Sequence, residues 1–226
     1  MTDKSKYIAE FFGTFILIFA GCGAIVANNA FDGALGHSGV ALAWGLVVMV
    51  LIYSIGNVSG AHMNSAVTLT FWLSKDFEGR LVPGYLISQV LGAIAGAGFL
   101  KLMFPEDPTL GATLPNAGLW QTFLMEVLLS FILMFVIFNV STAHMEKGIM
   151  AGVAVGGTVG LDAMFGGPMT GASMNPARSM GPALVSGNLG DLWIYILAPV
   201  VGMFAAYPVS RIIQADAGKE NPNEAA

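Results

Sequence analysis

The sequence predicts an all-α membrane protein with six transmembrane helices plus two re-entrant half-helices, arranged as an inverted repeat of three spans each. Three observations support this fold class: the composition, the lengths of the apolar segments and a duplicated short motif. Of the 226 residues, 55% are hydrophobic and only 10% are charged, and the mean hydropathy is +0.72. A soluble domain of this length needs a more strongly charged surface, so we expect a polytopic membrane protein.

Six apolar segments are long enough to cross a bilayer, since a transmembrane helix needs roughly 20 mostly apolar residues. Two further apolar segments, 63–72 and 174–185, are too short to cross, and each follows a glycine-containing approach. Segments of about 10 apolar residues are more often re-entrant than spanning, so two half-helices are expected there. The six predicted spans are approximately 7–28, 38–56, 82–103, 119–141, 148–166 and 191–212.

The short motif occurs once in each half of the chain. Residues 59–67 read SGAHMNSAV and residues 170–178 read TGASMNPAR, at an offset of 111 positions. YIAEFFGT in the first span resembles FLMEVLLS in the fourth, which puts Glu10 and Glu126 at matching places. We therefore expect a single domain over 1–226, with a first repeat in 1–114 and a second in 115–226. Three spans per repeat is an odd number, so the second repeat is inverted, and the two half-helices meet at the membrane midplane.

The charged residues predict the orientation in the membrane. With six crossings, the side without the termini holds Asp32, Glu106, Asp107 and Asp191, with only Lys101 near a helix end. The positive-inside rule then places both termini in the cytoplasm, under a plasma or bacterial inner membrane. The basic residues on the side of the termini are Lys4, Lys6, Lys75, Arg80, Lys147, Arg211 and Lys219.

Asn64 and Asn175 stand at the expected N-termini of the two half-helices. An asparagine oxygen can accept hydrogen bonds from the free backbone N–H groups of the first turn, which leaves the amide hydrogens as donors. Each half-helix also carries about half a positive charge at its N-terminus. Two such termini in mid-membrane repel cations and protons, whereas a neutral hydroxylated solute can exchange hydrogen bonds with them.

The remaining residues argue against an enzyme and against a pump. Ser173 is a lone serine, no histidine follows His144, and no G-x-x-x-x-G-K nucleotide-binding loop occurs. His37 and His144 are expected in loops and form no metal-ligand cluster with each other or with Cys22, the single cysteine. We therefore expect no cofactor, no metal site and no nucleic-acid partner. An ion-coupled secondary transporter remains an alternative, because it too can use inverted repeats and broken helices.

The paired motifs resemble the signature of the major intrinsic protein family, the aquaporins and glycerol channels. The resemblance covers nearly the whole chain, and the stretches GATLP, LMFVI and FGGPMTGASMNPARSMGPA most resemble the nodulin-26-like branch. It implies a homotetramer in the lipid bilayer with one pore per subunit. The two signature copies are Asn64, Ser65 and Ala66, and Asn175, Pro176 and Ala177, the second followed by Arg178.

The resemblance also implies a selectivity filter at four positions. Water-selective members place a histidine and bulkier groups there, so the two alanines of this chain are expected to make the filter wider. Trp44 is expected to supply an apolar wall opposite Arg178. A slip of one position in register would put Asp162 or Met164 in place of Ala163. The four filter positions are Trp44, Ala163, Ala172 and Arg178.

Two further features concern the support of the half-helices. Glu10 and Glu126 lie inside spans, and they are expected to accept hydrogen bonds from the backbone leading into each half-helix. Ser65 departs from the usual proline: it keeps the backbone N–H and loses the ring that pre-sets the first helical position. Because this is a small change in helix propensity, the first half-helix is expected to persist.

Together these features predict a passive channel for water and small uncharged solutes that excludes ions and protons. Glycerol-like polyols are the expected solutes, with undissociated metalloid hydroxides also implied by the nodulin-26-like resemblance. A mainly water-selective pore is the principal alternative. The order of preference among these solutes, any gating and the role of Asp162 remain open at this stage.

Overall fold

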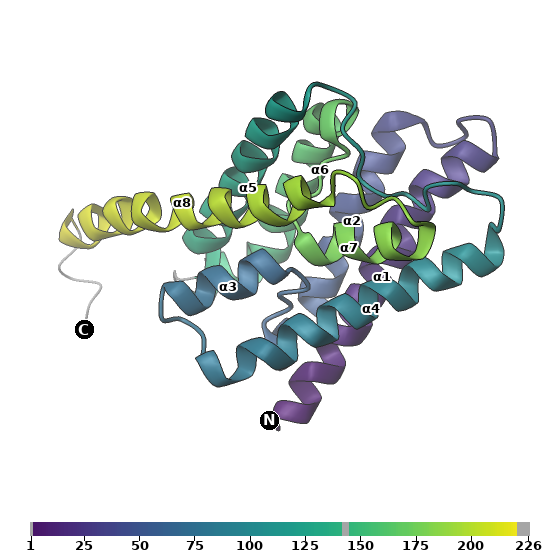
Figure 1. The fold of residues 1–226 in the computed structure, drawn as a ribbon. Coiled ribbons are helices and arrows are strands. Elements are labelled where there is room, and N and C mark those ends of the chain that lie inside the picture. The colour runs from purple at the N-terminus through teal and green to yellow at the C-terminus, as the bar shows by residue number, and fades with distance from the viewer. Residues whose placement is uncertain (1, 142–144, 221–226) are drawn as a thin grey trace.

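The computed structural model describes residues 2–141 and 145–220, and this part of the chain consists of helices and their connections, without a strand. His144 and the side chains of Lys147 and Lys219 lie outside the described residues. Figure 1 shows the long helices packed into one body, with the start of α1 at the bottom and the described end of α8 at the left. The elements are α1 (Asp3–Ala30), α2 (Gly36–Ser59), α3 (Ser65–Leu73), the 3₁₀ helix η1 (Gly79–Leu81), α4 (Val82–Met103), α5 (Leu119–Ser141), α6 (Met145–Thr170), α7 (Pro176–Ser186) and α8 (Leu192–Glu220).

Six of the described helices, α1, α2, α4, α5, α6 and α8, are long and apolar enough to cross a membrane. The predictions of six spans and of an all-α fold are therefore confirmed. The helices α3 and α7 have only 9 and 11 residues. At a rise of about 1.5 Å per residue, neither is long enough to cross a bilayer.

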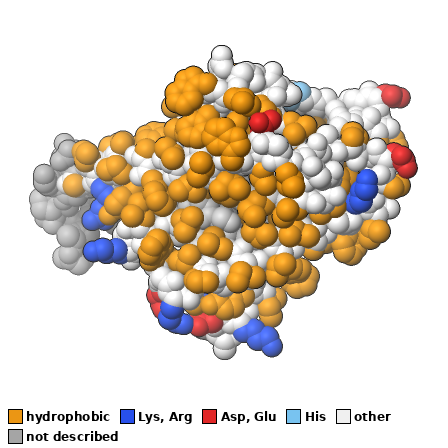
Figure 2. Space-filling model, in the orientation of Figure 1, with side chains coloured by type: hydrophobic (Ala, Val, Ile, Leu, Met, Phe, Trp, Pro, Cys, Tyr) orange, Lys and Arg blue, Asp and Glu red, His pale blue; other side chains and the backbone are white. Residues whose placement is uncertain are grey.

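The outer surface of the helices is apolar. Large side chains such as Phe12, Ile87 and Leu161 are each more than half exposed. Figure 2 shows hydrophobic side chains over the middle of the visible face, with the charged side chains mostly toward its ends. This distribution is that of a multi-pass membrane protein, in which lipid replaces water around the middle of the helices.

Glycines allow the spanning helices to approach closely. A Cβ on Gly45 of α2 would lie 2.7 Å from the carbonyl oxygen of Gly156 on α6, and a Cβ on Gly92 of α4 would overlap the carbonyl oxygen of Phe11 on α1. Small residues at such crossings let membrane helices pack backbone against backbone. The half-helices α3 and α7 each pack against α4 and α8.

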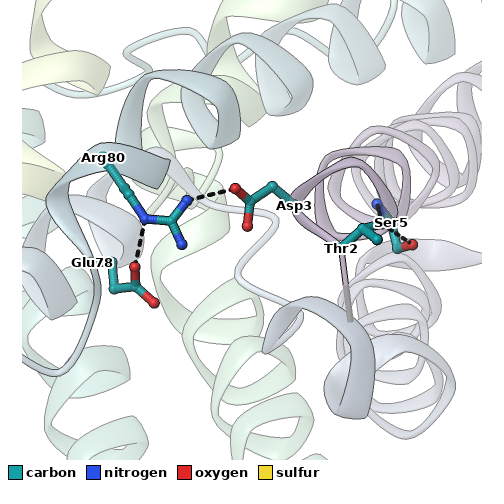
Figure 3. Close-up of polar contacts among 5 residues, drawn as sticks. All are labelled: Thr2, Asp3, Ser5, Glu78 and Arg80. Atoms are coloured by element: carbon teal, nitrogen blue, oxygen red, sulfur yellow. Dashed lines mark hydrogen bonds and ion pairs between the residues drawn. The ribbon is translucent and has the colours of Figure 1, made fainter.

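The start of the chain is tied to the connection between α3 and α4 (Figure 3). Thr2 caps α1 by accepting a hydrogen bond from the Ser5 backbone N–H, and Arg80 forms ion pairs of 2.6 Å with Asp3 and 2.7 Å with Glu78. All three charged side chains are well exposed, and such pairs contribute little to stability. They orient the N-terminus rather than stabilise the fold.

Replacing Gly92 by alanine should destabilise the protein, because the added Cβ overlaps the backbone of α1. Overpacking of this kind costs about 1–3 kcal/mol. Gly98→Ala is the matched control on the same helix, since no heavy atom lies within 4 Å of its added Cβ. The control should gain about 0.5–1 kcal/mol from helix propensity. Thermal unfolding in detergent checks both, and equal midpoints for the two variants would contradict the packing argument.

Candidate functional site

The N-termini of the two half-helices meet inside the protein. Asn64 caps α3, and its side-chain oxygen accepts hydrogen bonds from the backbone N–H groups of Ala66 and Val67. Asn175 caps α7 in the same way, with the N–H groups of Ala177 and Arg178 as donors. Both asparagines have extended backbone dihedrals, as N-cap residues do.

Reciprocal hydrogen bonds join the two caps. Nδ2 of Asn64 donates to the carbonyl oxygen of Met174 at 2.7 Å, and Nδ2 of Asn175 donates to that of Met63 at 2.8 Å. An amide group carries two hydrogens, so one hydrogen of each asparagine is engaged here and the other is left for a passing oxygen atom. The pair can therefore offer two donors at one level of the pore.

Glu10 of α1 organises the backbone that leads into α3. Its Oε1 accepts hydrogen bonds from the Ser59 hydroxyl and the His62 N–H, and its Oε2 accepts one from the Met63 N–H. The carboxylate is fully buried. Buried backbone N–H groups outside a helix need a partner, and in lipid water cannot supply it. The side chain of Glu10 supplies it here.

Glu126 of α5 makes the matching contacts ahead of α7. It accepts hydrogen bonds from the Thr170 hydroxyl and from the N–H groups of Ser173 and Met174. A tyrosine hydroxyl completes each arrangement at 2.8 Å: Tyr85 donates to the carbonyl oxygen of Ser59, and Tyr195 donates to that of Thr170.

Four non-glycine residues in these approaches adopt left-handed backbone conformations. This conformation costs roughly 1–2 kcal/mol for an L-residue and persists where the surroundings over-determine it. Here the backbone is held by hydrogen bonds to the two carboxylates. Glu10 binds the N–H group of Met63, and Glu126 binds that of Met174. The four residues are Ala61, Met63, Ala172 and Met174, with φ between 43° and 53°.

Ser65 joins a buried polar network that the usual proline could not join. Its hydroxyl donates to Oε1 of Gln89 at 3.1 Å, and Nε2 of Gln89 donates to Glu10 and to the Thr68 hydroxyl. His62 extends the network, with Nδ1 lying 3.0 Å from the Thr68 hydroxyl. The hydroxyl of Ser65 thus fixes the orientation of the Gln89 amide, which in turn contacts the carboxylate that organises the approach.

A cavity of about 150 Å³, the inner cavity, is lined by both caps, and a second cavity of about 450 Å³, the outer cavity, is lined by residues near the end of α1 and the start of α2. The inner cavity has two kinds of wall. One is formed by the backbone approaches 60–63 and 172–174 together with Asn64 and Asn175. The other is apolar and includes Leu17, Val48, Ile52, Leu133, Val155 and Val159.

Three of the four predicted filter residues line both cavities: Trp44, Ala163 and Arg178. They therefore separate the inner space from the outer one, while Ala172 lines the inner cavity. Ala163 differs from its two neighbours in this respect. Asp162 is fully buried, Met164 is 46% exposed, and neither lines these cavities.

Trp44 and Arg178 are in contact and do not face each other across the pore, in contrast to the expectation. Cζ of Arg178 lies 4.6 Å from the centre of the Trp44 ring, a cation–π arrangement. The ring can lie this way because Gly21 of α1 has no side chain, and a Cβ there would overlap it. Nη1 of Arg178 donates to the carbonyl oxygen of Gly111 at 2.8 Å, and Nε and Nη2 have no partner among the described residues.

Asp162 remains outside the site. Neither of its carboxylate oxygens has a hydrogen-bond partner in the described part of the chain. The expectation that His37 lies in a loop is wrong, since it is the second residue of α2. Among the described residues no group of His, Cys, Asp and Glu side chains could hold a metal ion.

Several residues at this site were not predicted from the sequence. Gln89 and the tyrosine pair carry no motif, although Tyr85 and Tyr195 stand at nearly the same offset as the duplicated motif, which was an available signal. Gly111 contributes only its carbonyl oxygen, and no residue type is required for that contact.

Comparisons with known proteins agree with this geometry. The family described as "Major intrinsic protein" matches residues 1–209. The chain is 48% identical to "Aquaporin NIP1-1" of Zea mays over 201 residues, which cover 88% of this chain and 71% of that protein. It is 45% identical to "Nodulin-26" of Glycine max over 210 residues, 92% of this chain and 78% of that one. The solved aquaglyceroporin from Plasmodium falciparum superposes with a TM-score of 0.83 at 27% identity, over 94% of this chain and 97% of that chain.

Ser65→Ala should destabilise the protein, because it leaves the buried Oε1 of Gln89 without this donor. Such a loss costs about 1–3 kcal/mol. Ser65→Pro also loses the hydroxyl, but proline fits the first position of a helix, so its loss should be smaller. Thermal unfolding of both variants, each also made together with Gln89→Met, measures the coupling. An undiminished effect of Ser65→Ala in the Gln89→Met background would contradict the assigned contact.

Proposed function

Because this chain belongs to the major intrinsic protein family and is a channel for water and small solutes such as glycerol, we propose that its filter favours hydroxylated solutes with a carbon backbone. In this proposal Trp44, Ala163, Ala172 and Arg178 form the filter, and glycerol-like polyols pass together with water. Undissociated metalloid hydroxides, which are small neutral polyhydroxylated molecules, are admitted by the same chemistry. Transport is passive and involves no cofactor, metal or catalytic step.

The mixed lining of the inner cavity, backbone approaches and asparagine caps together with apolar side chains, is the observation that carries this proposal. A linear polyol has C–H groups along one edge and hydroxyl groups along the other. The apolar wall accepts the C–H edge without loss of hydrogen bonds, and the approaches and caps offer partners to the hydroxyl edge. Lining groups and pore diameter are what set selectivity in a channel of this kind.

The filter adds donors between the inner and the outer cavity. Arg178 is 1% exposed and has two nitrogen atoms, Nε and Nη2, that are not paired within the described part of the protein. A buried charge with free donors is costly, and a solute oxygen that reaches it regains a hydrogen bond. Ala163 and Ala172 are the small members of the set, and their size leaves room for a carbon chain beside the stacked Trp44 and Arg178 pair.

Exclusion of ions and protons follows from the paired helix N-termini. The first turns of α3 and α7 both direct positive partial charge toward the level of Asn64 and Asn175. A cation there loses its hydration shell and meets repulsion. The two asparagines act as donors, so a water molecule at this level accepts their hydrogen bonds, which interrupts a continuous proton-conducting chain.

The proposal extends to the assembly and its placement. We propose a homotetramer in a cell membrane, plasma or bacterial inner, with both termini in the cytoplasm. In support of this orientation, the basic residues Lys4, Lys6, Lys75, Arg80 and Arg211 fall on one side of the six spans. We also propose that residues 1–114 and 115–226 are the two repeats of one channel domain, related by inversion. The matched contacts of Glu10 and Glu126 support this division.

Stopped-flow light scattering on proteoliposomes tests the selectivity. Vesicles are shrunk in sucrose to measure water permeability, and in glycerol to measure re-swelling. The proposal expects fast shrinkage in both and fast re-swelling in glycerol, with a low activation energy and no effect of an ion gradient. Re-swelling no faster than in empty liposomes would mean a mainly water-selective pore. Saturable flux that depends on an ion gradient would mean a coupled transporter.

Ala163→His should convert the channel toward water selectivity. Ala163 is 7% exposed and lines both cavities, so a bulky side chain there narrows the passage. The steric cost for glycerol, about 1–3 kcal/mol by analogy with overpacked sites, corresponds to roughly 5- to 150-fold lower glycerol permeability, with water affected less. Met164→His is the matched control, because that side chain does not line these cavities. A greater loss of glycerol flux in the control would put the filter one position away.

A further inference from the structure

A proline breaks the hydrogen-bond ladder of α6 near its outer end. In a helix the carbonyl oxygen of residue 164 accepts the N–H of residue 168, but residue 168 is Pro168, which has no N–H. The carbonyl oxygen of Met164 is thereby freed one residue after Ala163. The freed carbonyl oxygen can accept a hydrogen bond from a donor on a neighbouring helix.

His37 of α2 is that donor. Its Nε2 lies 2.7 Å from the carbonyl oxygen of Met164, and a carbonyl oxygen can only accept, so Nε2 carries the hydrogen. The approach depends on Gly167, because a Cβ there would lie 3.0 Å from Cε1 of His37. The contact between α2 and α6 at this point thus depends on His37 together with Met164, Gly167 and Pro168.

The connection before α5 also binds this end of α6. The backbone N–H of Asn116, in the connection before α5, donates to the carbonyl oxygen of Met169 at 3.0 Å, and its side chain donates to that of Pro168 at 3.3 Å. His37, Asn116 and Pro168 all line the outer cavity, and Ala163 lies on its inner boundary. Of these three hydrogen bonds, that of His37 is the nearest to Ala163 along α6.

We propose that His37 is a specificity-determining positioning residue: by binding the carbonyl oxygen that Pro168 frees, it fixes the helix turn that carries Ala163 and so sets the width of the filter. This proposal rests on the assignment of Ala163 to the filter. Glycerol fills the filter more completely than water does. A displacement of this turn should therefore change glycerol permeability more than water permeability.

The test measures the ratio of glycerol to water permeability of the full-length channel in proteoliposomes. A ratio does not depend on how much protein folds or inserts, which separates positioning from general destabilisation. His37→Ala should change the ratio by about two- to tenfold in either direction, the size of one net hydrogen bond. His37→Gln keeps an N–H donor and should largely restore the original ratio. Leu42→Ala, at an exposed site of the same helix, is the control and should leave the ratio unchanged.

Pro168→Ala provides the discriminating background. It restores the backbone N–H group at position 168, which can donate to the carbonyl oxygen of Met164. His37→Ala should therefore have little further effect when it is combined with Pro168→Ala. An unchanged ratio in His37→Ala, or an equal effect with and without Pro168, would overturn the proposal. Absence of glycerol flux in the unaltered channel would instead overturn the proposed solute range. The His37–Pro168 coupling would then be decided from the unfolding midpoints of the same four proteins, and additive midpoints would reject it.

Discussion

The structure depends on two buried carboxylates that accept hydrogen bonds from backbone unable to form a helix. Glu10 and Glu126 each hold a pair of consecutive N–H groups, His62 and Met63 in one approach and Ser173 and Met174 in the other. With those N–H groups paired, the chain can stay non-helical in the middle of the membrane. The half-helices can then begin there, with their N-termini facing each other.

The mixed lining of the inner cavity follows from this arrangement. The non-helical approaches bring backbone polar groups to the cavity, while the spanning helices contribute Leu17, Val48 and Val155. The position of that backbone is determined by the two carboxylates. Ala163 contributes only a methyl group, so a substitution there is expected to alter the width of the passage rather than these hydrogen bonds.

Two further features show how a local departure from regular helix structure is matched by a hydrogen-bond partner on another helix. Ser65 occupies the place of a proline, and its hydroxyl is used to orient Gln89 beneath Glu10. Pro168 removes a donor from α6, and His37 replaces it from α2. Each case couples a local irregularity of the sequence to a residue on a different helix, close to the pore.

The sequence by itself determined the six spans, the two half-helices and the identity of the asparagines and glutamates, because a bilayer admits few backbone arrangements and the duplicated motif marks the exceptions. Only the tertiary structure decided which groups complete the site. Gln89, Gly111 and His37 contact partners that lie 24 to 127 positions away in the sequence, and no sequence pattern predicts these contacts. The contact of Trp44 with Arg178 likewise depends on the space that Gly21 leaves on a neighbouring helix. Such contacts arise from how the helices pack, and packing depends on all the helices together.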